Sequence, residues 1–144
     1  MAGCMNTRFA VAVHVLTYLA GVPEGQATSS DELSRSANVN PVHVRRVLGP
    51  LREAGLVLSR PGVHGGWELA AHASAITLGQ VWRILHGVDP VLAVHRPNPD
   101  CPVGRSVQDS LVALDRVVAD GLVRELDRHT VHDLVMGDAA SMVL

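Results

Sequence analysis

The stretch from residue 38 to residue 70 reads NVNPVHVRRVLGPLREAGLVLSRPGVHGGWELA, and it decides the fold of this chain. It opens with Asn40 as a helix cap and Pro41 at the first helical position, a pair that is typical of a helix start. Two short apolar segments follow at 56–59 and 67–70, and a tip rich in glycine separates them. Segments of this kind around a glycine-rich tip are typical of a β-hairpin. The stretch therefore predicts a helix followed by a two-stranded hairpin.

Two further helices are expected before this stretch. Apolar residues recur at helical spacing between residues 5 and 20, and Ser29 or Ser30 can cap a short helix that runs to about Ala37. Three helices followed by a hairpin are the order of a winged helix-turn-helix, a fold that places one helix in the major groove of DNA. The predicted fold class is therefore mainly α with a small β-hairpin wing.

The helix that begins at Pro41 has two different faces. Its inward positions are apolar, whereas its outward positions near the helix start are mostly polar or charged. A helix that reads DNA needs this division, because one face must pack on its domain while the other meets base edges. The apolar positions are Val44, Val47, Leu48 and Leu51, and the positions that point outward or to the side are Val42, His43, Arg45 and Arg46.

The net charge of −2 and the pI of about 6.4 do not by themselves indicate a nucleic-acid partner. The distribution of charge does, because five arginines and two glutamates between residues 35 and 68 give this segment +3 and leave −5 for the rest of the chain. All 12 cationic side chains are arginine, the better bidentate partner for phosphate and guanine. A genome rich in arginine codons would explain the absence of lysine equally well.

Twelve positions in this part of the chain are candidates for contact with DNA. The outer helix face suits base edges, helix starts suit phosphates, and a glycine-rich tip can approach a DNA backbone closely. A solvated helix face is the ordinary alternative for any single arginine. The candidates are Ser29, Ser30, Asn40, Pro41, Val42, His43, Arg45, Arg46, Arg60, His64, Gly65 and Gly66.

The C-terminal half predicts a connector and a long helix. Thr77 can cap a fourth helix, a proline-rich connector follows at 87–102, and apolar residues at helical spacing continue to about His129. We expect residues 5–86 to form the DNA-binding domain and residues 103–135 to form a dimerisation helix with a short terminal turn. A continuous apolar stripe needs cover, and a second copy of the chain is favoured over the chain's own domain. The stripe consists of Val107, Leu111, Leu114, Val118, Leu122 and Leu126.

Four segments resemble the Rrf2 family of bacterial winged-helix transcriptional regulators. They are AVHVLTYLA in the first helix, LREAGLV after the third, PGVHGGWELA in the wing and ITLGQVWRILHG in the fourth helix. The resemblance covers about residues 6–134 and implies a homodimeric regulator, with repression favoured, that reads a palindromic DNA operator. One departure lies in the wing, where Pro61 replaces the basic residue that several relatives carry before the first glycine.

Two cysteines, Cys4 and Cys101, are too few for a disulfide framework. Many members of the family bind an iron–sulfur cluster through three cysteines in the connector, whereas this connector holds only Cys101. The resemblance is therefore to members that lack this site, and we expect no cofactor and no metal, with a mixed-ligand site at His14 or His95 left open. Cys101 is a candidate redox group, because a helix N-terminus stabilises a thiolate. A buried cysteine that packs against the helix start is the alternative.

Other functions have less support. A small-molecule effector could bind beside Trp67, Trp82 and the apolar part of the connector, but no polar pattern indicates its chemistry. An enzyme is not expected, because the glycine-rich tip lacks the Lys-Ser or Lys-Thr of a phosphate-binding loop and nothing brings Cys101 to face His95. A protein-interaction module is the second non-DNA alternative. We expect a cytoplasmic protein, because there is no clear signal peptide and no apolar run reaches the ~20 residues of a membrane span.

Overall fold

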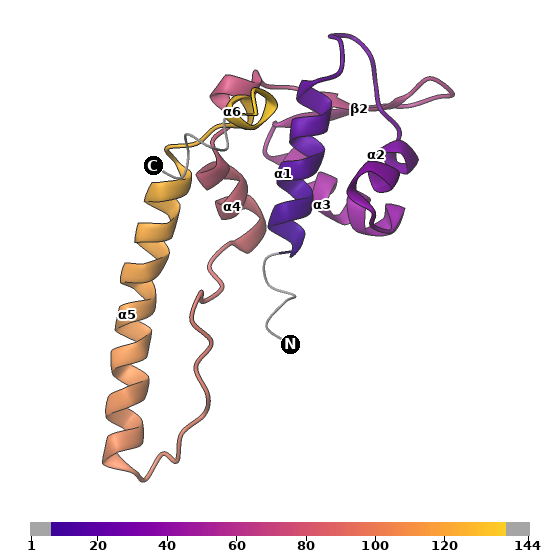
Figure 1. Ribbon diagram of the computed structural model, residues 1–144. Coiled ribbons are helices and arrows are strands. Elements are labelled where there is room, and N and C mark those ends of the chain that lie inside the picture. Colours follow the sequence, from indigo (N-terminus) through magenta and orange to yellow (C-terminus); the bar gives the residue numbers. More distant parts are fainter. Residues whose placement is uncertain (1–6, 138–144) are drawn as a thin grey trace.

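The structure of the protein, a computed structural model, describes residues 7–137, so Cys4 lies outside the described part. A helical body carries the hairpin wing on one side and the long helix α5 on the other (Figure 1). This arrangement confirms the predicted class, mainly α with a small β-hairpin wing. The elements in chain order are α1 (Thr7–Ala20), α2 (Ser30–Ala37), α3 (Pro41–Glu53), β1 (Val57–Arg60), β2 (Gly66–Leu69), the 3₁₀ helix η2 (Ala73–Ala75), α4 (Leu78–His86), α5 (Pro102–Leu126) and α6 (Val131–Val135).

The core lies where α1, α3, α4 and α6 meet. Side chains from all four helices are fully buried there, and those of α3 belong to the apolar stripe predicted from the sequence. Burial of one such aliphatic side chain contributes about 1.5–3 kcal/mol, which is more than helix propensity supplies to a single position. The members with 0% exposure include Ala12, Val15, Leu16, Val44, Val47, Leu48, Leu51, Ile76, Val81 and Val131.

Local caps set the ends of the helix-turn-helix. The Ser29 hydroxyl accepts the backbone N–H of Glu32 at 3.1 Å, and Asn40 Oδ1 accepts that of Val42 at 2.8 Å. Between these helices Asn38 adopts a left-handed conformation (φ 53°, ψ 47°), which asparagine tolerates better than most residues. The predicted caps at Ser29 and Asn40 are therefore confirmed, and the turn between α2 and α3 is tight.

The wing is attached to the body through the segment before α2. Strands β1 and β2 pair antiparallel and begin one residue later and one residue earlier, respectively, than predicted. Thr28 and Trp67 exchange both backbone hydrogen bonds, at 2.9 and 2.8 Å. Gly66 lies at this contact with φ +146°, and a Cβ atom there would be 2.4 Å from the carbonyl oxygen of Thr28. The close approach of the two backbones therefore requires glycine.

The C-terminal segment differs from the prediction. Helix α5 ends at Leu126 rather than near His129, and Thr130 starts α6 with a capping box that includes Asp133. Val131 is fully buried, and its N–H donates to the carbonyl of Ile76 at 3.0 Å. Residues 131–135, which the sequence grouped with the dimerisation helix, therefore pack on the helical body, against α1 and η2.

A bidentate ion pair holds the end of α5 to α4. The Arg83 guanidinium donates to both carboxylate oxygens of Asp127, at 3.0 and 2.5 Å, and the Thr77 hydroxyl donates to Oδ1 at 3.3 Å. A Cβ atom at Gly79 would lie 1.9 Å from the same oxygen, so glycine makes room for the carboxylate. The hydrogen bond from Arg83 holds the pKa of Asp127 below its usual value.

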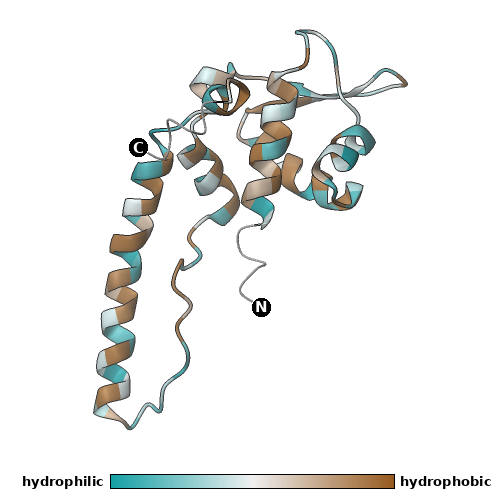
Figure 2. Cartoon of the chain, in the orientation of Figure 1, coloured by the Kyte–Doolittle hydropathy of each residue, from teal (hydrophilic) through white to brown (hydrophobic). Residues whose placement is uncertain are grey.

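The rest of α5 extends away from the body beside the connector (Figure 1). The carboxylate of Asp115 ties the two together, because its Oδ1 accepts the backbone N–H groups of Val91 and Leu92 at 2.8 and 2.6 Å. No residue of α5 is buried. Apolar residues occur along the length of the helix (Figure 2), and Leu114 and Val117 are 48% and 62% exposed. Within residues 7–137 the long helix thus keeps an uncovered apolar surface, and no described helix is long and apolar enough to cross a bilayer.

Asp127→Asn should lower the melting temperature at pH 7. At acidic pH the variant and the wild type should melt at similar temperatures. A carboxylate whose pKa is lowered by folding stabilises the protein above its unfolded pKa of about 3.9 and loses this contribution as the pH falls through the folded value. The difference in melting temperature from wild type should therefore be largest above about pH 5 and shrink toward about pH 3.

The matched control is Asp109→Asn, which removes an exposed carboxylate from the same helix and should show no comparable dependence on pH. If Asp127→Asn lowers the melting temperature by the same amount across this pH range, side-chain packing, rather than the ion pair with Arg83, explains the role of Asp127.

Candidate nucleic-acid interface

The outer face of α3 presents two arginines without intramolecular partners. Val42, Arg45 and Arg46 lie one turn apart and are all exposed, and Gly49 continues this face without a side chain. In the described part of the chain neither arginine has a hydrogen bond or an ion pair. Each guanidinium therefore keeps its full set of five N–H donors for an external partner.

His43 points to the side of α3 rather than straight outward, the second of the two orientations that the sequence allowed. Its side chain is half-buried, and its Nε2 atom is enclosed by protein without a hydrogen-bond partner. On a helix with 3.6 residues per turn, position 43 lies almost above the buried Val47, which explains why the ring turns inward. This nitrogen does not reach the exposed face, so the reading face is narrower than the sequence indicated.

The other arginines near the wing are held by intramolecular contacts. Arg60 Nη2 lies 2.9 Å from Glu68 Oε1 on the neighbouring strand. Arg52 donates to the Ser59 hydroxyl at 3.5 Å and lies over the ring of Trp67, 5.7 Å from its centroid. To contact a phosphate, Arg60 would have to break its ion pair with Glu68, whereas Arg45 and Arg46 have no ion pair to break.

The two predicted phosphate sites at helix starts differ. The Ser29 hydroxyl caps α2, and the Ser30 hydroxyl accepts the indole N–H of Trp67 at 3.0 Å, but each hydroxyl keeps its own proton for donation. Asp31 and Glu32 lie in the first turn of α2 and oppose an anion there. The first turn of α3, with Asn40 as its cap and Pro41 at its first position, contains no acid. The start of α3 is therefore the better place for a phosphate.

The wing tip exposes His64 and Val63 and contains glycines with structural roles. A Cβ atom at Gly65 would lie 2.0 Å from the carbonyl oxygen of Arg60, and Gly66 is needed beside Thr28. These contacts explain the glycines without DNA, so their place at the DNA surface stays a prediction.

The sequence suggested that the two tryptophans line one pocket. The structure instead places them at different sites. Trp67 bonds to Ser30 across 37 positions of sequence and ties the wing to the start of α2. Trp82 lies in α4 and faces Phe9 and the connector. The sequence did not predict the hydrogen bond between Trp67 and Ser30. The only signal for it is that a buried tryptophan usually needs an acceptor for its indole N–H.

Comparison with known proteins identifies the family of this chain. The family model for Rrf2, described as an iron-dependent transcriptional regulator, matches residues 5–137. The chain belongs to the Rrf2 family. YwnA of Bacillus subtilis (strain 168), whose description is HTH-type transcriptional regulator, is 35% identical over 132 residues, which are 91% of this chain and 96% of YwnA. These descriptions are of regulators and not of enzymes.

Solved structures of similar proteins agree with this assignment. A protein from Lactobacillus plantarum described as a transcriptional regulator superposes with a TM-score of 0.75 at 25% identity, covering 90% of this chain and 88% of that one. CymR, the global cysteine regulator of B. subtilis, gives a TM-score of 0.64 at 26% identity, covering 90% and 93%. The chain is thus a transcriptional regulator with the winged-helix fold of its family.

The connector of this Rrf2 regulator does not fit an iron–sulfur cluster held by several thiolates. It supplies one thiol, Cys101, which stands before α5, is half-buried and makes no capping hydrogen bond. In the stretch 7–137 no three His, Cys, Asp or Glu side chains are grouped closely enough to hold a metal ion. The nearby Arg105 donates to the carbonyl of Pro99 at 2.7 Å. A redox role for Cys101 stays a prediction.

Trp67→Phe and Ser30→Ala should destabilise the Rrf2 regulator in a non-additive way. Each single change removes the hydrogen bond between wing and α2, and Ser30→Ala also leaves an indole N–H without its partner, so the losses should be about 0.5–1.5 and 1–3 kcal/mol. The double variant should lose less than the sum, with a coupling of about 1 kcal/mol by urea denaturation. Strict additivity would show that the bond does not hold the wing.

Proposed function

We propose that this Rrf2 regulator is a homodimeric, sequence-specific DNA-binding repressor that acts in the cytoplasm. The observation that carries the proposal is the outer face of α3, where Arg45 and Arg46 are exposed and have no intramolecular partner among the described residues. Two neighbouring exposed arginines without counter-ions form a local positive patch that attracts an anionic partner. Double-stranded DNA supplies such a partner.

The first two turns of α3 enter the major groove in this proposal. Arg45 and Arg46 donate to base edges, with guanine as the preferred bidentate partner, and the methyl groups of Val42 suit a thymine methyl. The backbone amides at the start of α3 contact a phosphate and set the register. The wing tip, with His64, follows the adjacent DNA backbone, and Arg60 joins it if Glu68 releases the guanidinium.

The uncovered helix α5 supports a dimer. None of its residues is buried by the chain's own domain, and its apolar residues are distributed along its length. A stable interface buries more than about 1,000 Å² in total, and a 25-residue helix offers a surface of that order. Two copies related by a two-fold axis present two α3 helices, so the operator is expected to be palindromic. The direction of regulation, repression, rests on the family resemblance.

Arg46→Ala should weaken binding to a DNA site selected from genomic duplexes by about 1–3 kcal/mol, or roughly 5- to 150-fold. The change should also flatten the preference for guanine at one operator position, because a bidentate contact is lost. The measurement is fluorescence anisotropy over a salt series.

Arg96→Ala, which removes an exposed arginine from the connector, is the matched control and should bind like wild type. If Arg45→Ala and Arg46→Ala both leave DNA binding unchanged, the winged helix serves protein interaction instead. If a reporter gene under the operator loses expression when the regulator is deleted, the regulator is an activator and not a repressor.

Leu114→Glu should convert the dimer to a monomer at micromolar concentration, because a carboxylate then lies in the apolar contact of α5. Light scattering should give twice the 15.3 kDa chain mass for wild type and a single chain mass for the variant. Val63→Glu is the control, since Val63 is 97% exposed at the wing tip and its substitution should leave the mass unchanged. A monomeric wild-type protein would overturn the dimer.

A further inference from the structure

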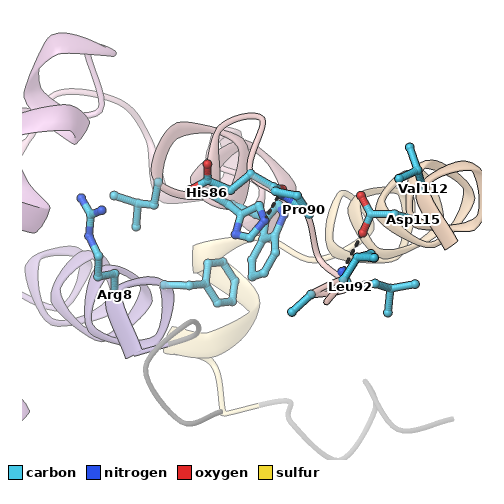
Figure 3. Close-up of a pocket in the computed structure, with 12 residues that line it drawn as sticks. Arg8, His86, Pro90, Leu92, Val112 and Asp115 are labelled. Carbon is cyan, nitrogen blue, oxygen red and sulfur yellow. Dashed lines mark hydrogen bonds between the residues drawn. The ribbon is translucent and has the colours of Figure 1, made fainter. Parts of the chain in front are cut away.

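An apolar pocket lies where the DNA-binding domain, the connector and α5 meet. Its volume is about 660 Å³, within the range of small-molecule sites. Arg8 lies at one end, Val112 and Asp115 lie at the other, and His86 and Pro90 lie between them (Figure 3). None of its residues belongs to the outer face of α3, and Val112 and Asp115 come from α5, the helix on which the proposed dimer also depends.

One wall of the pocket is a fixed aromatic surface. The rings of Trp82 and His86 are stacked, with centroids 4.4 Å apart and planes inclined by 18°, and Phe9 meets Trp82 edge-on at 5.3 Å. His86 Nε2 lies 2.7 Å from the carbonyl oxygen of Asp89. Because a carbonyl only accepts, Nε2 carries the proton, and this bond holds the ring in place. A flat apolar molecule can pack on such a wall.

Two hydrogen-bond donors of the pocket have no partner. Trp82 is 6% exposed, yet its indole N–H bonds to nothing in residues 7–137, whereas the indole of Trp67 bonds to Ser30. This N–H is open to solvent, so an acceptor atom can reach it. The Arg8 guanidinium likewise has neither a hydrogen bond nor an ion pair within the described range. A ligand that satisfies both groups must carry acceptor oxygens and negative charge.

The opposite end of the pocket excludes a second anionic group. Asp115 lines that side, and its Oδ1 already accepts two backbone N–H groups of the connector. Negative charge on a ligand is therefore favoured beside Arg8 and disfavoured beside Asp115. This asymmetry orients the ligand along the pocket.

We propose that this pocket binds a flat aromatic carboxylate of one or two rings. The ring system packs against the wall formed by Trp82 and His86, and the carboxylate lies at the Arg8 end, where the unpartnered guanidinium is available. Pro90 and Leu92 of the connector also line the pocket. The proposal does not rest on DNA binding, so its failure and that of the proposed function are separate results.

The test uses the full-length protein labelled with 5-fluorotryptophan and 2-naphthoate as the probe. The chain has two tryptophans, so the fluorine spectrum contains one signal for Trp82 in the pocket and one for Trp67 in the wing as an internal control. We expect 2-naphthoate to shift the Trp82 signal saturably, with half-saturation below about 1 mM, and to leave the Trp67 signal in place.

Variants then test the chemistry of the site. Arg8→Gln should weaken 2-naphthoate at least about five-fold and remove its advantage over the neutral 2-naphthamide, because a charge-assisted contact is lost. Arg96→Gln, outside the pocket, should bind like wild type. Ala93→Phe, which fills the pocket, should abolish the shift while the Trp67 signal reports an intact fold.

Two results would overturn the proposal. One is a Trp82 signal that does not move up to about 5 mM probe, which in a dimeric protein would indicate that the second copy covers the pocket. The other is a shift that is the same in wild type, Arg8→Gln and Ala93→Phe, because the probe would then bind elsewhere.

Discussion

The burial of one face of α3 is the constraint on which the rest of the structure depends. Val44, Val47, Leu48 and Leu51 have no exposure, and together they fix the rotation of the helix about its axis. A rotation by one residue, about 100°, would bring a neighbouring arginine toward the core, where an unpaired charge costs several kcal/mol. The exposed position of the arginines of α3 is thus a consequence of packing, and the same packing explains why His43 turns inward.

The intramolecular partners of the arginines, rather than the number of arginines, decide where positive charge is available for DNA. The chain has a net charge of −2, and the arginines around the wing are neutralised or stacked, Arg60 by Glu68 and Arg52 on Trp67. At the other end of the domain Arg83 is taken up by Asp127. What remains in the helix-turn-helix is the pair on α3 together with the exposed Arg35 on α2, which has no ion pair among the described residues, so the unpaired positive surface is small. A modest net charge is therefore compatible with a DNA-binding face.

Two carboxylates, Asp115 within α5 and Asp127 directly after it, determine how the long helix relates to the DNA-binding domain. Asp127 ties its last turn to α4, and Asp115 ties its middle to the connector. The connector is therefore tied near its start to the middle of α5, and the pocket beside Trp82 and His86 borders this contact at Asp115. Any molecule in that pocket touches α1, α4, the connector and α5 at once. In a dimer these elements set the separation of the two α3 helices.

The sequence by itself determined the features that depend on short-range spacing. The caps at Ser29, Asn40 and Thr77, the buried stripe of α3 and the hairpin all follow from residues a few positions apart, because capping bonds and helical faces are local. Tertiary structure alone decided the inward turn of His43, the packing of Val131 and the bonds from Trp67 to Ser30 and from Arg83 to Asp127, which span 37 and 44 positions. Such contacts depend on how the elements cross in space, and the periodicity within one helix carries no information about that crossing.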